Sequence, residues 1–103
     1  MVKNNEIFQN EIDNALLNFK KANYNEAIND LEKLKKKQSH FIVYWYLGHS
    51  YFRIYDYLSA ASCIKKSIEL KEPDALNLSF LAEIYLEANN YDESIRLFKE
   101  VLK

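Results

Sequence analysis

Few residues in this sequence are of the types that bind metals or act as nucleophiles. The two histidines, His40 and His49, lie nine positions apart, and Cys63 is the only cysteine. Neither pattern matches the short spacings, such as C-x2-C or H-x3-H, with which a chain binds zinc. We therefore expect no metal site and no cofactor, and a buried Cys63 that is unreactive.

The sequence does not indicate acid–base catalysis or phosphate binding either. Aspartates and glutamates occur singly on polar helical faces, so we expect no pair of carboxylates in an apolar cleft. The chain has one glycine, Gly48, which excludes a glycine-rich loop around a phosphate. We expect no catalytic residues and predict that the protein is not an enzyme.

The charge balance argues against two further classes of partner. Fourteen basic and fifteen acidic residues give a net charge of -1, so we expect no nucleic-acid partner and no anionic membrane partner. The run 35–37 of three lysines is typical of a solvated helix end, where cations complement the exposed carbonyls. No apolar run approaches the roughly 18 residues of a membrane span. The first residues lack the apolar core of a secretory signal, so a cytoplasmic location is expected.

Aromatic residues are the most informative local feature. Fifteen of the 103 residues are aromatic, and eight of them fall within 41–57. A helix over 41–54 is apolar on every side, and a small domain cannot bury all sides of one helix. We therefore expect part of it to line an exposed surface. The alternative is that Trp45 and Phe52 simply pack in the core.

The elements that must position these residues are helices. One glycine and one proline are too few for the turns of a β-sandwich or barrel. Apolar residues recur at helical spacing, which predicts six helices, over about 5–21, 23–37, 39–54, 56–71, 75–88 and 90–103. Asn23, Asp56 and Asn90 are the expected N-caps, with Glu26 and Glu93 at capping-box positions.

Residue types repeat along the chain with a period of 33 or 34. Three sets share this spacing: Tyr24, Tyr57 and Tyr91; Ala27, Ala60 and Ser94; and Leu31, Ile64 and Phe98. A fixed period of this length indicates one helical hairpin that is stacked three times, because a single hairpin cannot bury its own apolar face.

At these positions the chain resembles the tetratricopeptide repeat family, whose pattern is W-x2-L-G-x2-Y, then A-x3-F, then P. The middle repeat has Tyr44-x2-Leu47-Gly48-x2-Tyr51, Ala60-x3-Ile64 and Pro73. The third has Leu78-x2-Leu81-Ala82-x2-Tyr85 and Ser94-x3-Phe98, and the first is degenerate. The resemblance implies a single domain, 1–103. Its fold would be an all-α right-handed solenoid of three hairpins, with repeats at about 8–40, 41–74 and 75–103.

The resemblance also implies a binding groove lined by the first helix of each hairpin. The matching positions are Ile12, Leu16, Phe19, Ile42, Trp45, His49, Phe52, Arg53, Leu76 and Glu83. Such an apolar groove suits a peptide or an amphipathic helix. Some family members hold the carboxylate tails of chaperones with lysine, asparagine and arginine. Here those positions hold Ile12, Leu16, Tyr46, Leu76 and Phe80, which argues against an Hsp70/Hsp90 co-chaperone role.

Two functions follow as hypotheses. The first is a protein-binding module, in a specific form a small secretion-type chaperone or an adaptor. The second is an oligomerisation or scaffold module, or a fragment of a longer repeat protein. The sequence ends with the second helix of the third hairpin, and Ile95, Leu97 and Leu102 would then lack a following helix to cover them. A homodimer would cover that surface.

Overall fold

The computed structural model describes residues 4–103 and shows six α-helices. All lie within two residues of the expected positions. Their bounds are α1 (Asn4–Lys20), α2 (Tyr24–Lys37), α3 (Phe41–Arg53), α4 (Tyr57–Leu70), α5 (Ala75–Glu87) and α6 (Tyr91–Val101). No strand occurs in this part of the chain, and none of its helices is long and apolar enough to cross a membrane.

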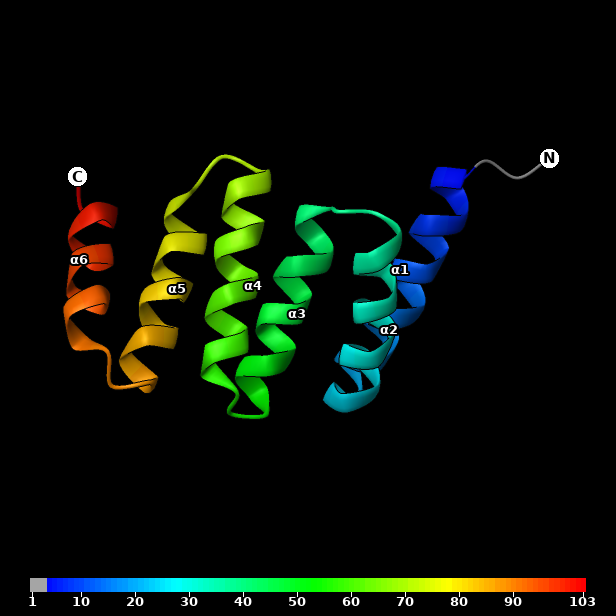
Figure 1. Ribbon diagram of the computed structural model, residues 1–103, viewed down its shortest axis with the longest axis horizontal. Coiled ribbons are helices and arrows are strands. Elements are labelled where there is room, and N and C mark those ends of the chain that lie inside the picture. The colour runs from blue at the N-terminus through cyan, green and yellow to red at the C-terminus, as the bar shows by residue number, and fades with distance from the viewer. Residues whose placement is uncertain (1–3) are drawn as a thin grey trace.

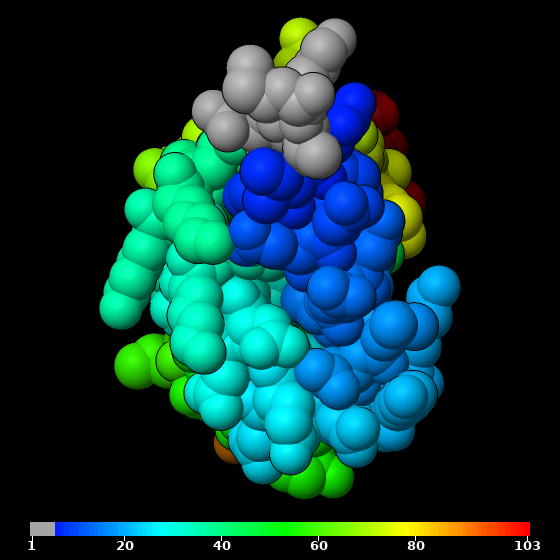
Figure 2. All heavy atoms as spheres, turned by 90° about the vertical axis from the view of Figure 1, so that its right-hand side faces the viewer, coloured from blue at the N-terminus to red at the C-terminus, as the bar shows by residue number. Residues whose placement is uncertain are grey.

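The six helices form an elongated array in chain order. Figure 1 shows α1 at one end and α6 at the other, with neighbouring helices antiparallel. Each helix packs on its neighbours in the sequence, and α1 also contacts α3. The molecule extends 50 × 26 × 20 Å. Figure 2 views it from the N-terminal end, where α1 and α2 lie side by side. The expected all-α solenoid of three hairpins is confirmed.

Each hairpin turns on one residue in the left-handed region, and none of the three is glycine. Ala22, Tyr55 and Asn89 have φ values of 62°, 67° and 63°. The amide of the following residue then donates to a carbonyl five positions back, as Asn23 does to Asn18 at 2.8 Å and Asn90 to Tyr85 at 2.8 Å. This is the helix-ending motif in which glycine is usual. The chain thus makes all three tight turns without glycine.

The N-caps differ in part from the expectation. Asp56 accepts from the Ser59 amide at 3.2 Å, as expected, whereas the side chains of Asn23 and Asn90 accept no capping hydrogen bond. The capping box also fails at Glu93, which accepts from Arg96 instead. The capping boxes fail because the backbone N–H groups of Asn23 and Asn90 already donate to the preceding helix, so no donor remains for the glutamate.

Two apolar clusters form the core. The first joins α1, α2 and α3 and includes Leu31 and Leu47, while the second joins α4, α5 and α6 and includes Ile64 and Leu81. Gly48 lies where α3 crosses α4, and a Cβ atom added there would overlap the Ile64 side chain. The small residue therefore sets how closely these two helices approach.

Candidate protein-binding groove

The first helices of the second and third hairpins, α3 and α5, form two adjoining hollows. One has a volume of about 250 Å³ and is lined by Phe41, Ile42, Trp45, Tyr46, Lys71, Asp74, Leu76 and Asn77. The other has a volume of about 210 Å³ and is lined by Trp45, His49, Leu76, Ser79, Phe80 and Glu83. Trp45 and Leu76 line both hollows. We call the two together the α3–α5 groove.

A hydrogen bond fixes Trp45 at the centre of this groove. Its indole Nε1 donates to Oδ1 of Asn77 at 2.7 Å, which links α3 to α5. Asn77 is only 6% exposed, and its backbone N–H donates to the Asp74 carboxylate at 2.8 Å. The half-buried indole N–H thus has a partner, which offsets the cost of its desolvation and restrains the ring.

His49 lies between two aromatic rings on the same wall. Its ring stacks on Phe80 with centroids 3.9 Å apart and planes 10° from parallel, and its centroid is 3.9 Å from that of Trp45. Within the described residues, its buried Nε2 atom has no hydrogen-bond partner. Burial, together with the nearby charge of Arg53, lowers the pKa of His49 to about 4. The imidazole is therefore neutral near pH 7.

Most of the residues expected in the groove lie on or beside this surface. Ile42, Trp45, His49, Leu76 and Glu83 line the hollows. Phe52 packs edge-on against Phe80, with centroids 5.4 Å apart. Leu16 and Phe19 are half-buried against the first core cluster, and Arg53 is exposed at the end of α3 and lines neither hollow.

One expected groove residue is a core residue instead. Ile12 is 3% exposed and belongs to the first cluster, because α1 packs against both α2 and α3 at this level. Asn77 was not anticipated as a groove residue, whereas Phe80 was expected only at a position equivalent to the chaperone clamp. Asn77 is a polar residue inside the apolar run 75–82, and that break in the pattern is the signal that could have identified it.

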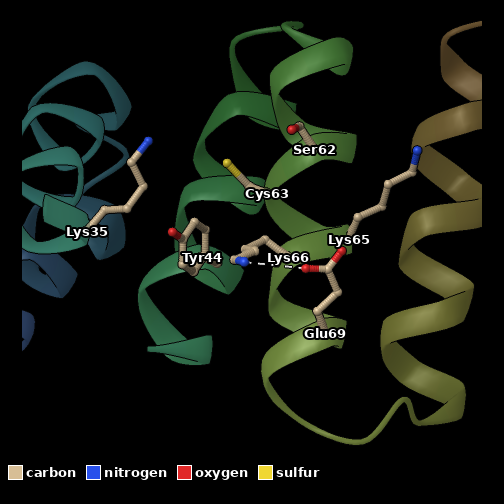
Figure 3. A pocket seen from close by; sticks show the side chains of 7 residues that line it. All are labelled: Lys35, Tyr44, Ser62, Cys63, Lys65, Lys66 and Glu69. Carbon is tan, nitrogen blue, oxygen red and sulfur yellow. Dashed lines mark ion pairs between the residues drawn. The ribbon is translucent and has the colours of Figure 1, made fainter. Parts of the chain in front are cut away.

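A third hollow lies between α2, α3 and α4, away from the groove. It has a volume of about 380 Å³ and is lined by Lys35, Tyr44, Ser62, Cys63, Lys65, Lys66 and Glu69. Figure 3 shows Lys35 and Lys65 at opposite sides of it, with Lys66 paired to Glu69 at 3.4 Å. Cys63 is buried, as expected, and burial raises the pKa of its thiol to about 11. The charges do not converge and the thiol stays protonated, so this hollow lacks the features of a reactive site.

Metal-binding side chains are not gathered anywhere in residues 4–103: no group of three or more histidines, cysteines or acidic residues could hold an ion. The expectation that the protein has no metal site remains a prediction.

The expected self-association surface is only partly exposed. Ile95 and Leu102 are 52% and 83% exposed, whereas Leu97 is 4% exposed. Leu97 belongs to the second core cluster because the face of α6 that carries it packs on α5. It is therefore not available for a second copy.

Comparison with known proteins gives consistent results. The family model described as anaphase-promoting complex, cyclosome, subunit 3, matches residues 9–101. Human tetratricopeptide repeat protein 13 is 32% identical over 79 residues, which are 77% of this chain. The chain spans 9% of that relative's length.

Solved structures of other proteins share the fold. The crystal structure of MamA has a TM-score of 0.86 at 19% identity, over 92% of this chain and 56% of MamA. The second tetratricopeptide repeat domain of Spaghetti (RPAP3), bound to the HSP90 peptide SRMEEVD, has a TM-score of 0.81 at 19% identity. That match covers 94% of this chain and 96% of the neighbour. At such low identity these matches show the fold alone.

Proposed function

Because the chain belongs to the tetratricopeptide repeat family, whose domains are protein-interaction modules, we propose that it binds a peptide or an amphipathic helix in the α3–α5 groove. The observation that carries this proposal is the exposure of Leu76. This leucine is 69% exposed at the border of both hollows, beside the half-buried ring of Trp45. Apolar surface of this kind, flanked by hollows, is typical of sites for apolar anchors.

The groove has the chemistry of an anchor site. Tryptophan is enriched among the residues that dominate binding energy at protein interfaces, and it lies here between two hollows. The Trp45–Asn77 hydrogen bond restrains the ring before binding. A restrained site loses less conformational entropy when it binds a ligand, which favours affinity.

A peptide partner is also supported by the structural neighbour that holds an HSP90 peptide. We do not extend that peptide to this chain, because its clamp-equivalent positions include Tyr46, Leu76 and Phe80. The finer proposals are an adaptor or a small secretion-type chaperone, in the cytoplasm. A partner that is insoluble when expressed alone would favour the chaperone, and a partner that is soluble alone would favour the adaptor.

The test uses two matched leucine substitutions. Octapeptides selected from a random display library on the wild-type protein should bind it, and Trp45, the only tryptophan, should report binding by fluorescence. Leu76→Glu should weaken binding by roughly tenfold or more, because a charge then faces apolar anchors. Leu58→Glu is the control, since Leu58 is 87% exposed on α4 and lines neither hollow. Equal binding to both variants would disprove the groove.

We propose self-association as a second candidate, on the exposure of α6. Tyr91, Ile95 and Leu102 are all at least half exposed there. If two copies pair through this face, the double variant Ile95→Glu/Leu102→Glu should be a monomer by light scattering at concentrations where the wild type is a dimer. A wild-type monomer at every concentration, or an unchanged mass in the variant, would exclude it.

A further inference from the structure

We propose that the hollow between Trp45 and Glu83 is a subsite for an arginine or lysine side chain of the bound peptide. The proposal rests on the proposed function and specifies the chemistry of the partner. Each hollow of the groove then binds a different kind of side chain. The hollow beside Ile42 receives an apolar anchor, and the hollow beside Glu83 receives the cation.

One side of the proposed subsite is the carboxylate of Glu83. Glu83 is exposed and lines the 210 Å³ hollow, one helical turn beyond Ser79 on the same face of α5. Five ion pairs join described residues, and none of them involves Glu83. Its negative charge therefore has no bound cation among the described residues and is available to a ligand.

Aromatic side chains of α3 and α5 line the same hollow as this carboxylate. Trp45, His49 and Phe80 line the same hollow. Aromatic rings attract cations through the negative potential of their faces, most strongly for tryptophan, and arginine is the cation found there most often. The chain uses the same pairing internally, where the ammonium of Lys71 lies 4.8 Å from the centroid of Phe41.

The charge and the shape of the hollow both suit a long cationic side chain. His49 is neutral because its pKa is lowered to about 4, so the imidazole does not repel an entering cation. Arg53 lies one turn further along α3 and does not line the hollow. A long cationic side chain has an apolar stem and a charged head. The stem would lie along Leu76 and Trp45, and the head would reach Glu83.

The test compares three pools of acetylated, amidated octapeptides. Every peptide contains one leucine, one test residue, and alanine, serine or glutamine at the other positions. The test residue is arginine in the first pool, norleucine in the second and glutamate in the third. Within each pool, the spacing between the leucine and the test residue takes every possible value. Binding is measured by Trp45 fluorescence to the wild type, to Glu83→Gln and to Glu87→Gln. Glu87→Gln is the matched control. It removes the same charge, and Glu87 lies one helical turn beyond Glu83 but lines neither hollow.

We expect the arginine pool to bind the wild type about three- to tenfold more tightly than the norleucine pool, the range for a cation at a partly exposed aromatic site. Glu83→Gln should remove most of this preference and Glu87→Gln should retain it. If norleucine binds as well as arginine, the cation subsite is wrong and the groove stands. If both glutamine variants lose the preference equally, the site is not at Glu83. If no pool binds, the subsite is disproved, and the display selection with Leu76→Glu decides the proposed function independently.

Discussion

His49 is a half-buried histidine in the wall of the α3–α5 groove, and its buried Nε2 atom has no hydrogen-bond partner in the described residues. Its ring is covered by Trp45 on one side and Phe80 on the other. The charged groups near it are Arg53 on its own helix and Glu83, which lines the same hollow. Burial dominates its titration, so the imidazole costs free energy to protonate in the folded protein.

This burial predicts a pH-dependent stability. In the unfolded chain His49 binds a proton near pH 6.5, and in the folded protein only near pH 4. Between these values the unfolded state binds more protons, so the free energy of unfolding falls as the pH drops through this window. His49→Phe removes this pH-dependent contribution to the free energy of unfolding. Urea titrations between pH 7.5 and 4 should therefore show a smaller loss of stability in the variant. Parallel curves for the two proteins would contradict the assignment.

Gly48 gives a second prediction at the scale of single residues. An alanine there gains about 1 kcal/mol in helix propensity but overlaps Ile64, and overpacking costs about 1–3 kcal/mol. We expect Gly48→Ala to lower the free energy of unfolding by about 1 kcal/mol on balance. Ile64→Ala removes both atoms, Cδ1 and Cγ1, that the new methyl group would meet. The double variant should therefore lose less than the sum of the two single variants, as measured by chemical denaturation. Simple additivity would show that the two sites do not touch.

At the scale of elements, the three hairpin turns are equivalent in geometry but not in sequence. Ala22, Tyr55 and Asn89 hold the same left-handed conformation, 33 and 34 residues apart. Asparagine tolerates this conformation better than alanine does. The turns therefore carry unequal backbone strain, and a substitution by glycine should relieve it unequally.

We expect Ala22→Gly to raise the free energy of unfolding by about 0.5–1 kcal/mol, after the entropy that glycine adds to the unfolded chain. Asn89→Gly is the control and should gain less, since it also loses the hydrogen bond from the Tyr91 hydroxyl, at 2.9 Å. Thermal denaturation of both variants measures the difference. A larger gain at Asn89 than at Ala22 would contradict the strain argument.

The elements also show what the sequence could predict. Periodicity placed all six helices, because each has one face buried against its neighbours and that face repeats every 3.6 residues. The absence of side-chain caps at Asn23 and Asn90 could not be predicted in the same way, since Asp56 follows the same kind of turn and does form its cap. The Trp45–Asn77 hydrogen bond could not be predicted from the sequence pattern either, because it joins residues 32 positions apart on two helices. Ile12 was misplaced because the repeat pattern does not specify how closely α1 and α3 pack.

At the scale of the whole molecule, the two core clusters lie at opposite ends of the array. The first is built mainly from α1, α2 and α3, and the second from α4, α5 and α6. Tyr51 packs against both clusters, and its hydroxyl donates to Glu32 of α2 at 3.0 Å. Burial and that hydrogen bond raise the pKa of Tyr51 to about 12. The link between the halves is thus concentrated around α3 and α4.

This layout predicts that the ends of the molecule respond separately to core damage. In a stacked array stability is a sum of local terms and nearest-neighbour interfaces, so a cavity weakens mainly the helices beside it. Leu31→Ala and Leu81→Ala remove equal side chains from the first and second cluster, at a cost of about 2–5 kcal/mol each. Hydrogen exchange under native conditions should show lost protection chiefly in α1 and α2 for the former and in α5 and α6 for the latter. The two variants serve as controls for each other. An equal loss in all six helices would mean that the three hairpins unfold as one unit and that the contacts around Tyr51 couple them fully.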